Sequence, residues 1–104
     1  MTNEIFDRLL DEWLIYIKST LASKGGEYAT DTDRLANFKL QARIKGTDQI
    51  DALWGNLTKH LASIIDWFQL RSNPTKAMRK EKIGDAINYL ILLDAILEEQ
   101  SNGK

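Results

Sequence analysis

The sequence predicts an all-α protein, a helical bundle of three long helices and one short helix. Apolar residues recur at the spacing of a helix face over three long stretches. No stretch alternates apolar and polar residues for long enough to predict a strand. The 104 residues, 43% of them apolar and three of them tryptophan, fit one packed domain over residues 1–104. We expect its core to span about residues 4–99.

The first helix is expected over residues 4–24. Asn3 can cap its amino end, and Gly25 and Gly26 are expected to end it. Residues 25–33 are then a loop. Helical spacing is kept by Ile5, Phe6, Leu9, Leu10, Trp13, Leu14, Ile17 and Leu21.

The short helix is expected over residues 34–44, capped by Asp31, Thr32 or Asp33 and closed by Gly46. Thr47 is expected to cap the third helix, which runs to about residue 71. The apolar face of that third helix comprises Ile50, Leu53, Trp54, Leu57, Leu61, Ile64, Ile65 and Phe68.

The fourth helix is expected over residues 76–99, after a break at Pro74. Residues 100–104 should fray. Nearly every position from Ala86 to Leu97 is apolar, so this helix must pack on several sides. Three long helices leave a shallow core at this size, and we expect a homodimer to complete the bundle.

Asp85 and Asn88 enter this apolar run three residues apart and therefore share a helix face. A buried carboxylate needs a cation, a metal, backbone donors or water. The pair is open to two interpretations. It could be a network that fixes helix register or a solvated first turn, or it could form the wall of a polar pocket inside the bundle.

Composition excludes several classes. A net charge of −1 gives no field that draws the chain to nucleic acid or to an anionic membrane. The absence of cysteine excludes disulfides and thiolate metal sites. The polar start does not resemble a signal peptide and no segment spans a bilayer, so we expect a cytoplasmic protein.

Functional side chains are dense around the loop and the short helix. Arg34 and Asn37 share a face; arginine suits bidentate phosphate binding, and asparagine can contact a base. Phe38 or Tyr28 can stack on a base. The structural alternative pairs Arg34 with Asp31 or Asp85, lets Asn37 cap a backbone group and puts Phe38 in the core.

Ionisable residues also interrupt the third helix. Lys59 could snorkel along an apolar face or hold a phosphate. His60, the one histidine, lacks the further ligands of a zinc site and is more often structural. Magnesium needs one or two carboxylates plus phosphates, and Asp85 with Glu81, four residues apart, is a candidate pair. Further carboxylate candidates are Glu27, Asp31 and Asp66.

Four stretches together point to a family resemblance: residues 24–29, residues 33–38, Lys59 with His60, and residues 81–89, which begin Glu-Lys-Ile-Gly-Asp. They resemble small phage and prophage proteins that look like a branch of the all-α nucleoside triphosphate pyrophosphatase superfamily of MazG type. The resemblance touches roughly residues 5–98.

The resemblance implies Mg²⁺ held by carboxylates on two adjacent helices and cleavage of a nucleoside triphosphate to monophosphate and pyrophosphate. Asp85 matches the family's metal ligand, but Lys82 stands where its second acid is expected. In place of the family's glutamate cluster, the third helix offers Lys59, His60, Ser63 and Asp66. Either another ligand set is used, such as Glu27 with Asp85, or a nucleotide is bound without hydrolysis.

Two functional hypotheses follow. In the first, a helical protein, phage-derived and acting in the host cytoplasm, binds a nucleotide or related phosphorylated ligand; if it is an enzyme, it is a Mg²⁺-dependent nucleoside triphosphate pyrophosphohydrolase. Asp85 would hold metal with help from Glu27 or Glu81, Arg34 and Lys59 would hold phosphates, and the base or sugar would meet Asn37, Phe38, Asn88 or Tyr28. In the second, a non-enzymatic helical interaction protein inhibits or adapts a host protein, and the polar residues are internal scaffold.

Overall fold

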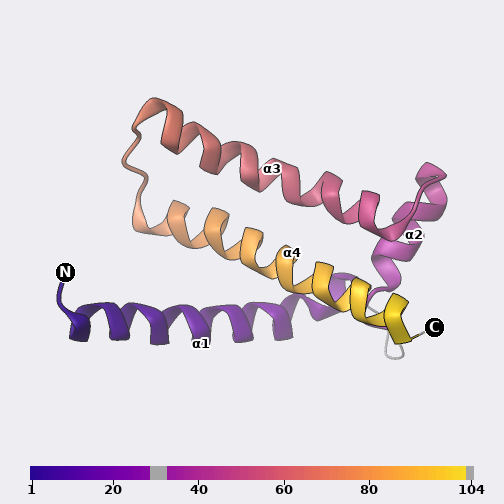
Figure 1. Ribbon diagram of the computed structural model, residues 1–104, viewed down its shortest axis with the longest axis horizontal. Helices are drawn as coiled ribbons and strands as arrows, with labels where there is room; N and C mark the ends of the chain where they lie inside the picture. Colours follow the sequence, from indigo (N-terminus) through magenta and orange to yellow (C-terminus); the bar gives the residue numbers. More distant parts are fainter. Residues whose placement is uncertain (29–32, 103–104) are drawn as a thin grey trace.

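The computed structural model describes the backbone of residues 1–28 and 33–102, and the side chains of residues 1–22 and 33–101. It confirms the all-α prediction of three long helices and one short helix. The helices are α1 (Asn3–Tyr28), α2 (Ala36–Lys45), α3 (Gln49–Leu70) and α4 (Lys76–Asn102). The antiparallel hairpin of α3 and α4 forms the centre of the molecule, α1 runs along α4 in the same direction, and α2 crosses one end (Figure 1).

Two predicted boundaries of α1 are wrong. Thr2 caps the helix: its Oγ1 accepts from the Ile5 amide at 3.2 Å, and its carbonyl accepts from the Phe6 amide at 3.0 Å. The helix also continues through Gly25 and Gly26 to Tyr28. Glycine in a helix costs only about 1 kcal/mol relative to alanine, so two glycines weaken a helix without ending it.

The connection from α2 to α3 differs in detail from the prediction. Asp33 Oδ1 accepts from the Leu35 amide at 2.9 Å, and regular helix begins at Ala36 instead of residue 34. Gly46 closes α2 as predicted, with the left-handed φ of 69° that glycine adopts freely. The cap of α3 is Asp48, which accepts from the Asp51 amide at 2.8 Å, and not Thr47.

The hairpin between α3 and α4 turns at Arg71, a non-glycine residue with a φ of 51°. The Ser72 amide donates to the Trp67 carbonyl at 3.1 Å and secures this turn. Thr75 caps α4 by accepting from the Met78 amide at 3.2 Å. The helix then continues to Asn102, so residues 100–102, which were expected to fray, are helical. Residues 103–104 lie outside the described chain.

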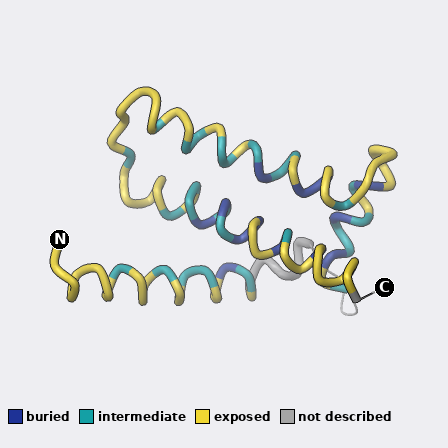
Figure 2. Tube along the Cα trace, viewed as in Figure 1, coloured by how far each residue is buried: buried dark blue, intermediate teal, exposed yellow. Residues whose placement is uncertain are grey.

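The core lies where α2, α3 and α4 meet. Figure 2 shows buried residues concentrated in α2, in the first half of α3 and in the middle of α4, while the start of α1 is exposed. The core cluster consists of Leu35, Phe38, Leu53, Leu57, Ala86, Tyr89, Leu92 and Ile96. The described parts of α1 and α3 do not pack on each other, so α4 separates them.

The contact between α1 and α4 depends on a glycine. A Cβ atom built on Gly84 would lie 2.7 Å from Cε1 of Tyr16 and 3.5 Å from the Trp13 ring. The two rings meet edge to face at 5.9 Å, and Lys80 Nζ lies 4.6 Å from the centre of the Trp13 ring. The absence of a side chain at Gly84 therefore lets α1 approach α4 closely.

Candidate functional site

Four side chains from three helices define what we call the polar centre: Thr20 of α1, His60 of α3, and Asp85 and Asn88 of α4. Thr20 and Asn88 are the buried polar residues of the described chain, with 8% and 6% of their surface exposed. Polar groups that leave water need partners, so such residues mark a position where the fold or a ligand supplies them.

The packing of α1 on α4 sets Thr20 beside Asn88. Tyr16 lies against Gly84, and the two helices run in the same direction. Thr20 comes one turn after Tyr16 and Asn88 one turn after Gly84, so they lie at the same level. Thr20 Oγ1 donates to the carbonyl of Tyr16 at 2.7 Å.

His60 reaches the same level from α3. Its Nδ1 lies 3.7 Å from Oδ2 of Asp85, close for an ion pair when the ring is protonated but beyond a hydrogen bond. Its ring stacks on Tyr89, with centroids 5.5 Å apart and planes 28° from parallel. The stacking fixes the plane of the imidazole beside the carboxylate, and both side chains are largely buried.

Asn88 is the most unusual member of the polar centre. Both its amide nitrogen and its amide oxygen are buried, and neither makes a hydrogen bond to the described residues. Leaving a buried donor or acceptor unpaired costs about 1–3 kcal/mol. A donor and an acceptor held side by side in this way are suited to a ligand that offers both in return.

Arg34 lies close to this level, although it is exposed. Its Nη2 donates to the carbonyl of Leu21 at 3.1 Å, and Leu21 directly follows Thr20. The guanidinium therefore lies within about a turn of Thr20. Arginine has five N–H donors, and the described contacts occupy one of them.

The other residues that the sequence singled out in the short helix serve packing. Asn37 Oδ1 accepts from Gln41, whose Oε1 accepts from Asn56 of α3 at 3.1 Å. Asn56 also donates to the Ala52 carbonyl at 2.9 Å. Phe38 is fully buried in the core cluster. The structure thus brings Asp85 and Asn88 together, and it engages Asn37 with α3 instead.

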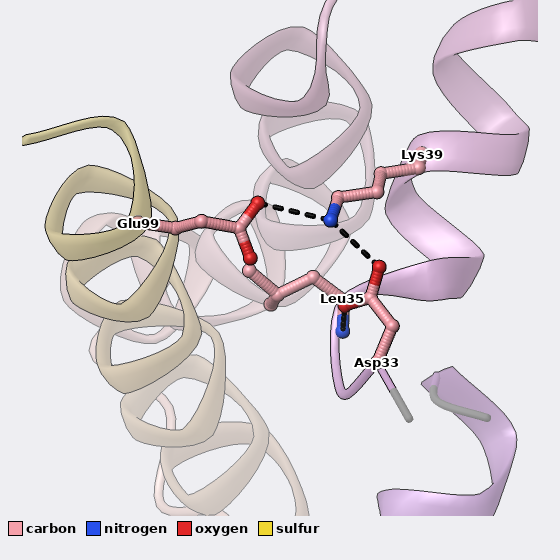
Figure 3. A network of polar contacts seen from close by, with 4 residues as sticks. All are labelled: Asp33, Leu35, Lys39 and Glu99. Carbon is pink, nitrogen blue, oxygen red and sulfur yellow. Dashed lines mark hydrogen bonds and ion pairs between the residues drawn. The ribbon is translucent and has the colours of Figure 1, made fainter. Parts of the chain in front are cut away.

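A second polar group joins the start of α2 to the end of α4 (Figure 3). Lys39 Nζ lies 2.6 Å from Asp33 Oδ2 and 2.9 Å from Glu99 Oε1. The hydrogen bond from Lys39, and then that from the Leu35 amide, lower the pKa of Asp33 below its usual value. Hydrogen bonds to Asp33 and then Glu99 raise the pKa of Lys39. Lys39 is paired with both carboxylates and ties α2 to the end of α4, so we interpret the group as a structural clasp.

The remaining candidates lie apart. Lys59 and Asp66 are exposed on α3, and Glu81 is exposed on α4, with Oε1 3.7 Å from Lys82 Nζ. The side chains of residues 23–32, which include Glu27, Tyr28 and Asp31, lie outside the described part. Among the described residues, no three His, Asp or Glu side chains gather to hold a metal ion.

Sequence reasoning missed Thr20 and left the role of His60 open. Thr20 continues the spacing of Leu9, Trp13 and Tyr16, the side of α1 that faces α4. A lone hydroxyl on an otherwise apolar face was therefore the available signal. For His60 no signal was available, because its position against Asp85 and Tyr89 depends on the register of α3 along α4.

A hollow of about 220 Å³ lies near the other end of α1, lined by Ile5, Arg8, Leu9, Glu12 and Lys76. Lys76 Nζ lies 3.7 Å from Glu12 Oε2 across it. Glu12 precedes Thr20 by eight residues, or roughly 12 Å of helix, so the hollow is separate from the polar centre.

Comparison with known proteins found no matching family model, no matching curated protein and no matching solved structure. Within the described chain, none of the helices combines the length and the apolar character that crossing a membrane requires.

Proposed function

We propose that this protein binds a nucleotide or a related phosphorylated ligand at the polar centre. The observation that carries the proposal is the buried amide of Asn88, whose nitrogen and oxygen make no hydrogen bond to the described residues. A nucleobase edge or a sugar hydroxyl pair presents the complementary donor and acceptor. The side-by-side arrangement of Asp85 and His60 adds a carboxylate and an imidazole to the same wall.

Arg34 supplies the positive group that a phosphate needs. Its guanidinium sits on the Leu21 carbonyl, within about a turn of Thr20, and it remains exposed at the rim. Arginine binds phosphate oxygens in a bidentate manner, and a partly exposed position leaves the phosphates in contact with solvent. In this arrangement the nucleobase or sugar of the ligand lies against Asn88, and its phosphates lie in solvent beside Arg34.

The proposal is confined to binding. Hydrolysis of the kind implied by the MazG resemblance needs several carboxylates around Mg²⁺, and the described residues of the polar centre include one carboxylate, that of Asp85. Any Mg²⁺ would be bound mainly by the phosphates of the ligand, and Asp85 is the carboxylate of the polar centre that could also bind it.

A thermal-shift panel of nucleoside mono-, di- and triphosphates, including deoxynucleotides, with and without Mg²⁺, tests the proposal. A ligand at about 100 times its dissociation constant stabilises the fold by roughly 2.7 kcal/mol. In a chain of this size that corresponds to a rise in Tm on the order of 10 °C. A panel in which no compound raises the Tm would overturn the proposal.

Two variants separate ligand binding from stability. Asn88→Leu should abolish the ligand-induced rise in Tm while leaving the free protein folded, because leucine has a similar size and no unpaired polar atoms. Arg34→Ala should weaken the binding of nucleoside triphosphates much more than the binding of the corresponding nucleosides, measured alongside the panel. The control is Arg43→Ala, an exposed arginine of α2, which should leave every shift unchanged.

A further inference from the structure

The α3–α4 hairpin exposes apolar side chains in two stripes. On α3 the stripe is Ile50, Trp54, Ile65 and Phe68, and on α4 it is Leu90 and Leu97 with half-buried Ile83 and Ile87. Trp54 and Phe68 expose 55% and 72% of their surface. Within each helix these residues recur at spacings that keep them on one side. We call the two stripes together the hairpin face.

Both stripes lie on the side of the hairpin away from α2. Residues two apart on a helix point in nearly opposite directions, about 200° apart. Trp54 is two residues from Asn56, which bonds to α2, and Leu97 is two residues from Glu99, which binds Lys39 of α2. The two stripes therefore combine into one apolar surface.

The chain exposes more surface than a monomer of its size. Its accessible area is 7398 Å², whereas a compact protein of 11.9 kDa exposes about 6,000 Å². Its radius of gyration is 15.8 Å, against about 13 Å for a compact chain of this length. The excess, roughly 1,400 Å², exceeds the ~800 Å² that each partner buries in a standard interface.

The order of residues along α4 is self-complementary. When two copies of α4 lie antiparallel about the step between Ala86 and Ile87, Ile83 of one copy faces Leu90 of the other. In the same register Arg79 faces Asp94, and both are exposed. Opposite charges at the ends of an apolar stripe favour this alignment over a shifted one.

The stripe on α3 has the same centre. His60 contacts both Asp85 and Tyr89, which sets Leu61 level with the step between Ala86 and Ile87. Antiparallel pairing of α3 about Leu61 places Trp54 of one copy opposite Phe68 of the other. A single two-fold axis that runs across the hairpin therefore pairs α3 with α3 and α4 with α4, as a closed symmetric dimer requires.

We propose that the hairpin face binds a second copy of this chain, antiparallel, with α3 on α3 and α4 on α4 about that two-fold axis. The dimer closes the open side of the hairpin and leaves the polar centre, on the far side with α2, free for its ligand. This inference is independent of the proposed function, since the two surfaces are opposite each other.

Sedimentation equilibrium of the full chain and its charge-reversal variants tests the dimer. Wild type should sediment at twice 11.9 kDa. Arg79→Glu and Asp94→Arg should each raise the dissociation constant at least about tenfold, because each turns two attractive pairs per dimer into repulsive ones. The double variant Arg79→Glu/Asp94→Arg should restore it. An equimolar mixture of the two single variants should form the mixed dimer in preference to either homodimer.

The matched control is Arg43→Glu, a charge reversal on α2, which should leave the dissociation constant unchanged. Circular dichroism confirms that each variant is folded. A wild-type chain that stays monomeric at about 200 micromolar, roughly 200-fold above a dissociation constant of 1 micromolar, overturns the proposal. A dimer that is indifferent to both single reversals also overturns it, because association then uses another surface.

Discussion

Replacing Gly84 by alanine tests the close approach of α1 to α4. The new Cβ would lie 2.7 Å from Tyr16 Cε1, a distance at which something must move. Tyr16 cannot turn away freely, because its ring meets Trp13 edge to face and lies 5.0 Å from Lys80 Nζ. Overpacking of this kind costs about 1–3 kcal/mol.

Gly55→Ala is the matched control, since a Cβ there would lie 3.6 Å from Lys45 Nζ, in ordinary contact. Both changes gain the same helix propensity, up to about 1 kcal/mol. Gly55→Ala should therefore be neutral or stabilising. The free energy of unfolding of Gly84→Ala, measured by urea unfolding followed by circular dichroism, should be about 1–3 kcal/mol lower than that of Gly55→Ala. Equal stability of the two variants would refute the reasoning that Gly84 is a packing residue.

Three further predictions concern single polar groups. Asp48→Ala should lower the free energy of unfolding by about 1 kcal/mol through loss of the α3 cap, whereas Thr47→Ala should leave it unchanged, both read by urea titration. Asn56→Leu should lower the free energy of unfolding by about 1–3 kcal/mol because it removes the hydrogen bond to Oε1 of Gln41, whereas Asn88→Leu should be neutral or stabilising in thermal melts. Equal losses would contradict the assignment of Asn88 as unpaired. Because folding lowers the pKa of Asp33, the ionised carboxylate stabilises the fold fully above the unfolded pKa of about 3.9, and this stabilisation is lost as the pH falls through the folded pKa. Asp33→Asn should therefore reduce the fall in Tm between about pH 5 and pH 2. An unchanged fall in Tm over this range would exclude the clasp as its source.

The helices were predictable because their signal is local. Apolar spacing located all four, and Gly46 and Pro74 marked real breaks. The errors fall at helix ends, where neighbouring residues compete. Asp48 and Thr47 are both good caps, and the sequence does not show which amide will be unpaired. At Gly25 and Gly26 the weak intrinsic preference of glycine against helix did not end α1, which continues to Tyr28.

The candidate site was predictable only in part. Asp85 and Asn88 share a face by spacing alone, so their proximity followed from the helix. The contacts of Asn37 with Gln41 and Asn56, and of His60 with Asp85, depend on how α2 and α4 pack against α3. Those arrangements are set by side-chain fit in the core, for which a single sequence carries no periodic signal.

The most direct test of the central claim follows the side-chain amide of Asn88 by nuclear magnetic resonance. Its two N–H signals are assigned as those absent from the spectrum of Asn88→Leu. If the ligand binds at the polar centre, titration with the nucleotides that raise the Tm moves these signals along a saturating curve, together with the imidazole signals of His60. Nucleotide binding that leaves the Asn88 amide signals in place would contradict it, because the ligand would then occupy another surface.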